Sequence, residues 1–461
     1  MTPGQPNILR GPNGFEWWLI YMANKNNEHR GQYINRVQFF DKTLFVDGIT
    51  GPRTAGYHPE PSMPTFAGKG ETASFGVLQQ VQPSVAYLFE TGVKTEGGAG
   101  VIAWWKDADN CAYVGLDAEN RSWYLRTLVG GKENKESYAL PEDFHWGVYH
   151  HLRIERNGGC LKIWLDEILA PGRHVFAEAL PAEEAGVPGV FDETKSALFE
   201  GAAYTIGFDD VHFQLSGNEE LLKGDFLNDY ELSFQLSGLS GQDKAGSYPV
   251  YVDKDNYVKA QFDGITRMLE VTAVKKGKTA WKKEFPLGCL QTLYPDVKYT
   301  DFIEKGYRFA APAWLDTLYL NRHEAGNKSE FVDDMFGKFD IEYLNGGEWH
   351  PIENKDRGIA EHPAYNYCTF TPVKAEGIRF INKEAEDLER HIYKIGVHEL
   401  WKESYNFRAV RRADKLYLFV DGRELGALDI RYPASRIGFC SEGGSPVYSG
   451  TLYYHVGQRR D

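Results

Sequence analysis

The stretch WWKDADNCAYVGLDAENRSWYL (104–125) has a second version, VYVDKDNYVKAQFDGITRMLEV (250–271), and this repeat decides the fold. Both versions place strand-forming residues on either side of an Asp-Asn turn, which is typical of a β-hairpin. A related stretch follows each one, YHHLRIERNGGCLKIWLDEI (149–168) in the first copy and YNFRAVRRADKLYLFVDGRE (405–424) in the second. The chain therefore uses one sandwich-sized β unit twice.

The spacing between the two copies changes part-way along the repeat. Asp109 aligns with Asp255 at an offset of 146 residues, whereas Arg153 aligns with Arg408 at an offset of 255. The second copy therefore contains about 109 extra residues between its halves. A domain inserted in this way is tolerated when the chain enters and leaves it at neighbouring strand ends.

Composition narrows the class of protein. With 461 residues, 48 glycines, 14% aromatic residues and almost no long helical periodicity, the chain is predicted to be all-β. A net charge of −14 argues against a nucleic-acid partner. The five cysteines show no Cys-x-x-Cys spacing, so we expect neither a disulfide framework nor a zinc site. We also expect no membrane span, and residues 1–25 lack the pattern of a signal peptide.

Turn signals divide the chain into four predicted modules. Residues 1–64 read as a four-stranded meander followed by a proline-punctuated linker, and 65–215 read as the first sandwich. The second sandwich is discontinuous and covers 216–288 and 404–461. Residues 289–403 form the insert, which has strand-like runs of its own.

The opening segment contains the runs PGQPNILRGPNG (3–14), WWLIY (17–21), RGQYINRVQFF (30–40) and VDGITGP (46–52). In their order and spacing these runs resemble the last blade of the five-bladed propeller of glycoside hydrolase family 43. Gln5 or Pro6 stands where that family usually has a histidine beside its central ion, which puts that role in doubt. The family's catalytic base, pKa-tuning aspartate and acid come from earlier blades that have no counterpart in this sequence.

The other modules resemble families that commonly accompany such propellers. The two repeats are similar to concanavalin-like, laminin-G-type sandwiches. The insert resembles the later part of a discoidin-type, galactose-binding-like module through FDIEYLNGGEWHPI (339–352), TPVKAEGIRF (371–380) and IGVHELW (395–401). The expected fold is therefore a partial propeller-blade-like sheet, two concanavalin-like jelly-roll sandwiches and an inserted galactose-binding-like β-sandwich.

Aromatic and arginine side chains are the candidates for sugar binding. Aromatic faces stack on sugar C–H groups, which makes Trp104, Trp105 and Trp123 candidates, although core packing is the alternative for each. Trp104 and Trp105 are adjacent on a strand, so only one of them can face the core. The propeller resemblance implies that Arg30 and Arg36 face a central pocket; the alternative is a surface arginine.

The repeated turns are candidate calcium sites. Asp107 and Asp109 recur as Asp253 and Asp255, and calcium takes several hard oxygen ligands. The alternative is that Asp-x-Asp-Asn closes the hairpin through bonds to its own backbone. No other cofactor is expected.

The sequence shows none of the common catalytic motifs. Glycoside hydrolysis needs a pair of carboxylates. No carboxylate of this sequence belongs to a motif typical of glycosidases, such as Glu-x-Asp-x-x-Glu on one strand. The sequence also has no Gly-x-Ser-x-Gly or His-Glu-x-x-His motif. We therefore assign no catalytic residue from sequence.

The resemblances together imply a carbohydrate-active protein. The first hypothesis is the C-terminal accessory region of a family-43-like exo-glycosidase of arabinofuranosidase or xylosidase type, binding plant cell-wall polysaccharide without catalysing its hydrolysis alone. One alternative is a glycoside hydrolase completed by a partner chain or an N-terminal region that supplies the other blades. Another is a non-enzymatic adhesion module. The resemblance implies a secreted or periplasmic location.

Overall fold

The computed structural model describes residues 2–25, 29–40, 43–46, 60–68, 75–240, 242–293, 302–303, 306–321, 337, 339–353, 356–360, 365–382, 394–402 and 404–457. All the named elements in these ranges are β-strands, paired in antiparallel sheets, so the predicted all-β class is confirmed. Within the same ranges, no helix has the length and apolar character needed to cross a membrane.

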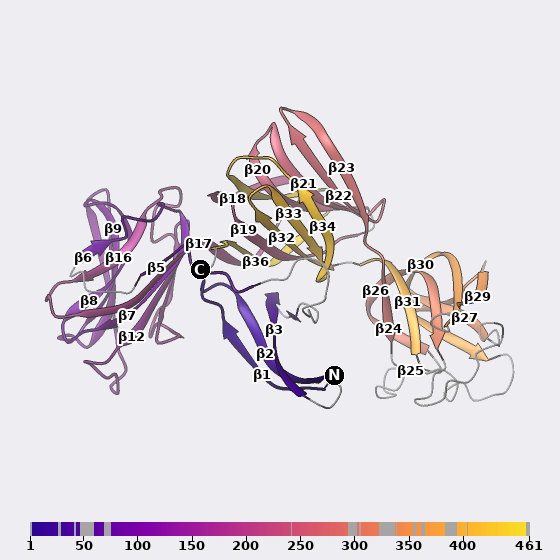
Figure 1. Cartoon of the computed structure of the whole chain (residues 1–461), viewed down its shortest axis with the longest axis horizontal. Coiled ribbons are helices and arrows are strands. Elements are labelled where there is room, and N and C mark those ends of the chain that lie inside the picture. The colour runs from indigo at the N-terminus through magenta and orange to yellow at the C-terminus, as the bar shows by residue number, and fades with distance from the viewer. Residues whose placement is uncertain are drawn as a thin grey trace.

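The N-terminal sheet is a four-stranded meander (Figure 1). Asn13 closes the turn between its first two strands, because its Oδ1 accepts hydrogen bonds from the backbone nitrogens of Phe15 (3.1 Å) and Glu16 (3.0 Å). In spatial order, the strands are β1 (Thr2–Arg10), β2 (Trp17–Lys25), β3 (His29–Phe40) and β4 (Thr43–Val46).

Each repeat contributes its own six-stranded sheet. The sheet of the first copy consists of β11 (Lys132–Ala139), β10 (Ser122–Val129), β9 (Asn110–Asp117), β8 (Gly98–Asp107), β16 (Val187–Asp192) and β6 (Phe75–Val77). The sheet of the second copy consists of β18 (Asn218–Leu227), β35 (Ser435–Glu442), β20 (Lys244–Asp253), β21 (Asn256–Asp263), β22 (Met268–Lys275) and β23 (Lys278–Pro286).

The opposing sheets of the two sandwiches are joined into one twelve-stranded sheet. Ten strands follow one path: β14 (Ile168–Leu169), β13 (Cys160–Leu165), β12 (His150–Asn157), β7 (Ala86–Lys94), β17 (Leu198–Gln214), β36 (Val447–His455), β19 (Tyr230–Ser237), β32 (Ser404–Arg412), β33 (Lys415–Val420) and β34 (Arg423–Asp429). The other two, β15 (Val175–Phe176) and β5 (Phe66–Gly68), pair with β13 and β17.

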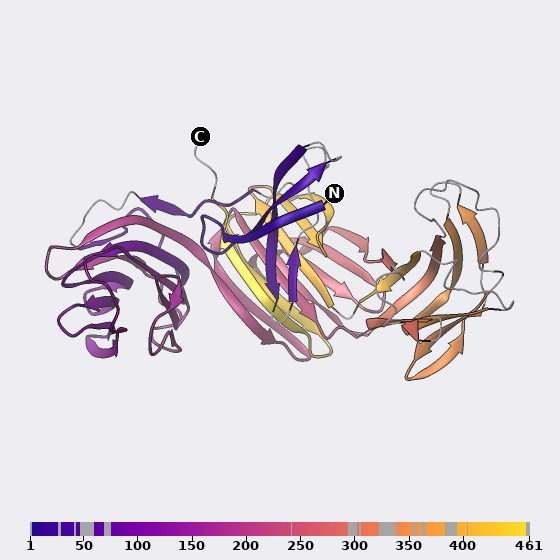
Figure 2. The ribbon, with the colours of Figure 1, turned by 90° about the horizontal axis from the view of Figure 1, so that it is seen from below.

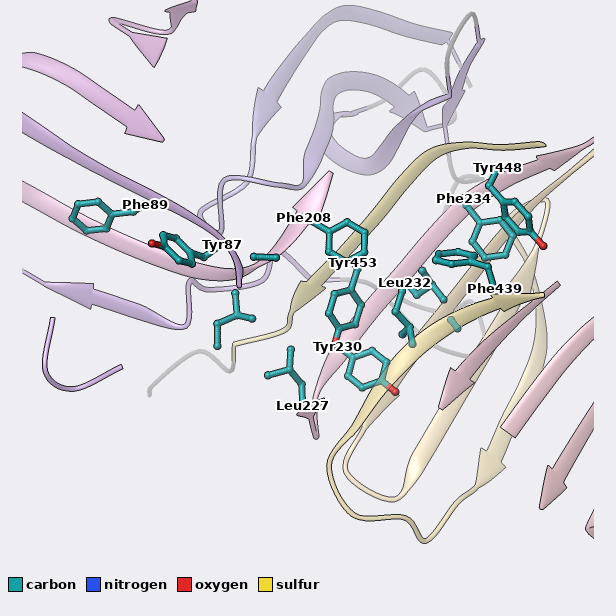
Figure 3. Close-up of a cluster of buried hydrophobic side chains, with 14 of the residues drawn as sticks. Tyr87, Phe89, Phe208, Leu227, Tyr230, Leu232, Phe234, Phe439, Tyr448 and Tyr453 are labelled. Carbon is teal, nitrogen blue, oxygen red and sulfur yellow. The ribbon is translucent and has the colours of Figure 1, made fainter. Parts of the chain in front are cut away.

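Strand β17 makes this sheet continuous. Residues 198–206 of β17 pair with β7 of the first sandwich, and residues 207–214 pair with β36 of the second (Figure 2). The buried core is continuous there as well. Figure 3 shows Phe208 and Tyr453 between Tyr87 of the first sandwich and Tyr230 of the second, with ring centroids 5.5 Å apart for Phe208–Tyr453 and 5.2 Å for Tyr230–Tyr453.

The two copies repeat their hydrogen bonds as well as their strands. Gly131 N donates to Asp109 O at 2.9 Å, and Gly277 N donates to Asp255 O at the same distance. Further along, both copies bury an arginine at one matching position, Arg156 in the first and Arg411 in the second. Both guanidinium groups donate to backbone carbonyl oxygens, which is how a buried charge is kept hydrogen-bonded.

The insert forms a separate eight-stranded sheet with its own apolar cluster. Along the chain, its strands lie between β23 and β32 of the second sandwich. Its main path is β24 (Cys289–Leu293), β31 (Lys394–Trp401), β26 (Gly306–Asn321), β30 (Tyr365–Asn382), β27 (Phe339–Asn345) and β28 (Glu348–Pro351), with β25 (Phe302–Ile303) and β29 (Asp356–Ala360) attached at β26 and β30.

A buried ion pair fastens the N-terminal sheet to the outer face of the twelve-stranded sheet. Arg36 Nη2 lies 2.7 Å from Glu231 Oε1 and donates to Tyr454 Oη at 2.5 Å. The side chains of Arg36 and Glu231 are 1% and 4% exposed. Burial alone raises the pKa of Glu231, but Arg36 and Arg408 outweigh it and hold that pKa below its usual value.

Close packing surrounds this ion pair. Phe15 stacks on Tyr454 with ring centroids 6.0 Å apart, and a Cβ on Gly14 would come within 2.9 Å of Leu88 of the first sandwich. A Cβ on Gly450, where φ is +56°, would come within 2.3 Å of Phe39 O. The N-terminal sheet therefore contacts both sandwiches.

Replacing Arg36 with methionine is expected to lower the free energy of unfolding by about 3 kcal/mol, because Glu231 would remain buried without its nearest positive charge. Urea denaturation of wild type and R36M measures the change. The double variant R36M/E231Q is the control, and we expect it to regain part of the loss. A loss below about 1 kcal/mol in R36M would show that the pair does not fasten the sheet.

Candidate functional site

The outer face of the second sandwich's six-stranded sheet carries a group of tyrosines. On β21, Val258, Ala260 and Phe262 enter the core, so the alternate residues Tyr257, Lys259 and Gln261 point outward. On β20, the register shifts between Ser247 and Val250. Because of this shift, Val250 enters the core, and both Tyr248 and Tyr251 point outward. We define the tyrosine face as Tyr248, Tyr251, Tyr257, Lys259, Gln261, Glu220 and Glu442.

The three rings of the tyrosine face form one aromatic cluster. Tyr248 lies edge-on to Tyr251 (centroids 5.6 Å apart) and to Tyr257 (5.3 Å). Tyr251 and Tyr257 are nearly parallel, 6.5 Å apart at an interplanar angle of 17°. Tyr248 is buried, whereas the other two rings are half-buried and present part of their surface to solvent. Such rings can stack on the C–H face of a sugar.

Charged side chains border these rings. Lys259 Nζ lies 2.6 Å from Glu442 Oε1, and Tyr248 Oη donates to Glu220 Oε1. Partial burial raises the pKa of Glu442, but hydrogen bonds from Lys259 and Gln261 outweigh it, so the pKa is lowered overall. Burial and Glu220 both raise the pKa of Tyr248. At neutral pH the face therefore presents an ionised carboxylate, an ammonium group and phenol hydroxyls, which can form hydrogen bonds with the hydroxyl groups of a ligand.

The equivalent face of the first sandwich has a different chemistry. At positions matching Tyr248, Tyr257 and Lys259 it carries Ile102, Cys111 and Tyr113, all of them buried. Cationic side chains cover this apolar layer: the Arg126 guanidinium lies 4.5 Å from the Tyr113 ring centroid. The first sandwich's face is thus a covered apolar layer, and the second exposes its rings.

Two of the three tryptophans predicted to bind sugar lie in the core. Trp104 and Trp123 are 0% and 1% exposed and belong to the main apolar cluster, so neither ring has a free face in this structure. Trp105, adjacent to Trp104, points to the outer face and is half-buried beside Tyr113. Strand β8 has a register shift between Ile102 and Trp104, and packing in the main apolar cluster shows that Trp104 is the inward-facing one of the two.

The structure does not place Arg36 at an open pocket. Its guanidinium is buried against Glu231 and Tyr454, where it fastens two modules. This corrects the expectation that Arg36 faces a substrate pocket, because a side chain 1% exposed cannot meet a ligand without leaving its ion pair. The side chain of Arg30 lies outside the described residues.

The repeated aspartates close hairpin turns. Asp107 Oδ1 accepts hydrogen bonds from Asp109 N (2.9 Å) and from Asn110 Nδ2 (2.9 Å). Asp253 binds Asp255 N (2.8 Å) and the side chain of the following asparagine (2.9 Å) in the same way. Among the described residues, no group of three or more acidic, histidine or cysteine side chains is placed to hold a metal ion. Calcium binding by Asp107, Asp109, Asp253 or Asp255 stays a prediction.

The sequence alone did not lead to a prediction of the tyrosine face. Tyr251 and Tyr257 stand at outward positions on either side of the Asp-Asn turn, matching Trp105 and Cys111 of the first copy. The alignment of the two copies could have indicated this face, because it places the aromatic residues Tyr251 and Tyr257 at positions that do not face the core. The contribution of Glu442 had no such signal, because Glu442 pairs with Lys244 of the neighbouring strand β20, which lies 198 residues earlier in the sequence.

Comparison with known proteins leaves the family open. No protein-family model matches this chain, and no curated protein matches it. Similar solved structures include the carbohydrate-binding module CBM66 from Bacillus subtilis (14% identity, 44% of this chain and 93% of that one, TM-score 0.22). Others are a GH43 protein from Bacillus licheniformis (13%, 44% and 53%, TM-score 0.22) and mouse laminin α1 domains LG4-5 (12%, 86% and 85%, TM-score 0.21). At these TM-scores the likeness carries no argument about function.

A buried carboxyl lies where the insert joins the second sandwich. Glu399, on β31, is 6% exposed. Burial is the main cause that raises its pKa to about 7; Asp421 adds to this effect and Lys402 opposes it. Strand β31 belongs to the insert's sheet, where Glu399 pairs with Cys289 of β24 and Leu315 of β26, so the first copy has no counterpart to this carboxyl.

Glu399 is expected to make stability fall with rising pH. The pKa of about 7 in the folded protein exceeds the ordinary glutamate pKa of 4.5, so the unfolded chain loses this proton first. The free energy of unfolding should drop by about 2 kcal/mol between pH 5 and pH 8 from this group. Urea denaturation of wild type and E399Q at pH 5 and pH 8 tests this. Equal pH dependence in wild type and E399Q would contradict the assignment.

The hairpin role of Asp253 predicts a calcium-independent effect. Replacing Asp253 with alanine removes the acceptor for two turn hydrogen bonds, so the melting temperature should fall equally in calcium and in EDTA. The matching variant D107A is the control in the other copy. A melting temperature that calcium raises in wild type but not in D253A would instead support the calcium site.

Proposed function

We propose that this chain is a carbohydrate-binding accessory region of a family-43-like glycoside hydrolase. The observation that carries the proposal is the tyrosine face, where half-buried rings stand beside groups that donate and accept hydrogen bonds. This combination suits saccharides, which present an apolar C–H face and a rim of hydroxyls. The proposed ligand is a plant cell-wall polysaccharide or oligosaccharide.

The geometry of the face suggests how a sugar would be held. Tyr251 and Tyr257 lie nearly parallel and share one side of the sheet, so one or two adjoining sugar rings can contact both. Glu442 accepts and Lys259 donates hydrogen bonds at the edge of these rings. None of these groups needs to react, because binding uses only stacking and hydrogen bonds.

The sequence resemblance of residues 1–52 to a propeller blade supports the family-43 part of the proposal. A four-stranded sheet has two faces to cover, and Ile34, Phe39 and Leu44 of this sheet are 44%, 47% and 51% exposed. Further blades, supplied by a partner chain or an N-terminal region, would cover such side chains. The proposed location, secreted or periplasmic, follows from the same resemblance.

Titration calorimetry with arabino-, xylo- and pectin-derived oligosaccharides tests the binding function. Wild type should bind at least one of them, and Y251A and Y257A should each weaken binding about tenfold, the equivalent of about 1.4 kcal/mol per lost stacking contact. Tyr417 is half-buried on β33 of the other sheet, so Y417A is the matched control and should keep wild-type affinity. If wild type bound none of the saccharides, or if Y251A/Y257A kept wild-type affinity, the proposed sugar-binding role of the tyrosine face would be contradicted.

A further inference from the structure

A second group of polar side chains lies on the outer face of β7 and β12, beside the N-terminal sheet. Along β12, Leu152 and Ile154 enter the core, so His151 points outward, as does Tyr149 just before the strand. Glu90 points outward from β7, and Arg10 reaches this area from β1. We call Arg10, Glu90, Tyr149, His151 and Glu167 the His151 cluster.

Short distances connect the members of the His151 cluster. His151 Nε2 lies 3.6 Å from Glu90 Oε2, and His151 Nδ1 lies 3.1 Å from Glu167 Oε1. Arg10 Nη1 lies 3.6 Å from Glu167 Oε2. The cluster is open to solvent: Tyr149 is 47% exposed, and the side chains of His151 and Glu167 are 31% and 63% exposed.

The second copy shows that the sandwich fold does not need these residues. Strand register pairs Glu90 with Arg153 and, in the second copy, Ser233 with Arg408, so Ser233 matches Glu90. By the same correspondence, Ser404, Asn406 and Gly422 match Tyr149, His151 and Glu167. Both copies keep the surrounding backbone bonds, since residues 166 and 421 donate to the carbonyls of residues 151 and 406 at 2.8 Å.

Glu167 is kept despite an unfavourable backbone conformation. It occupies the second position of a two-residue hairpin turn with φ +63°, where the second copy has Gly422 with φ +74°. Turns of this kind favour glycine at that position, because a side chain is disfavoured at positive φ. The first copy thus retains a carboxylate at a position where glycine would be better for folding.

An arginine under the cluster supplies an independent observation. Arg153, on the same face as His151 and directly across from Glu90, is 5% exposed. Its Nε and Nη1 have no hydrogen-bond partner among the described residues, although the guanidinium lies 5.0 Å from the Trp164 ring centroid. The same two atoms of its counterpart Arg408 also make no hydrogen bond within the described part of the chain, but there Nη1 has the Glu231 carboxylate 3.8 Å away. A buried guanidinium without an acceptor calls for oxygen atoms from elsewhere.

We propose that the His151 cluster is a second saccharide site, which takes a neutral, hydroxyl-rich sugar. Glu90 and Glu167 accept hydrogen bonds from paired hydroxyls, Arg153 and His151 donate to sugar oxygens, and the exposed Tyr149 ring contacts the C–H face. Two carboxylates facing two guanidinium groups leave the site close to electrically balanced, which disfavours both acidic sugars and cations. The inference rests on the proposed function only in taking carbohydrate as the ligand.

The second copy supplies the variant that tests this site. Y149S/H151N/E167G gives the first copy the residues that the second copy already carries on the same backbone. It should melt no lower than wild type, because glycine relieves the positive φ of residue 167. Titration with neutral arabino- and xylo-oligosaccharides should show two sites in wild type and one in this variant. Y251A/Y257A should retain the site that the triple variant loses.

The outcomes separate this inference from the proposed function. Unchanged stoichiometry in the folded triple variant would overturn the His151 site and leave the tyrosine face standing. Loss of all binding in the triple variant alone would support this site and overturn the other. Should the triple variant not fold, H151N alone serves, with tenfold weaker binding at one site expected. Preference for galacturonate oligomers, or binding that requires added zinc, would overturn the neutral-sugar assignment.

Discussion

The backbone pairing of β17 is the constraint on which the rest of the structure depends. One strand completes the hydrogen bonds of β7 in the first sandwich and of β36 in the second, so the two sandwiches share a sheet. Separating them would expose paired backbone groups along a seventeen-residue strand together with the Phe208 and Tyr453 rings. The outer faces of the two sandwiches are therefore held in a fixed relation.

The N-terminal sheet depends on this shared sheet. It contacts Leu88 of one sandwich and Glu231 of the other, and those two residues lie close together only because β17 joins their strands. The buried charge of Arg36 is tolerated because Glu231, Tyr454 and nearby packing replace water around it. An arginine that sequence assigns to a ligand pocket thus fastens modules together.

The repeat acts as an internal control on what the fold requires. Where the two copies agree, as at Arg156 and Arg411, the residues satisfy the architecture. Where they differ on one backbone, as at Glu167 and Gly422, the fold accepts either residue. The functional proposals rest on such differences, because packing alone does not explain them.

The sequence by itself determined the all-β class, because alternation and turn residues are local signals, and its spacing predicts a repeat with an insertion in the second copy. It also showed that only one of Trp104 and Trp105 can face the core, without saying which. Only the tertiary structure decided that Trp104 is the buried one, that Arg36 is in an ion pair and that Tyr251 and Tyr257 share an open face. Burial and ion pairing join residues hundreds of positions apart, and no local pattern records which sheet lies opposite a given strand.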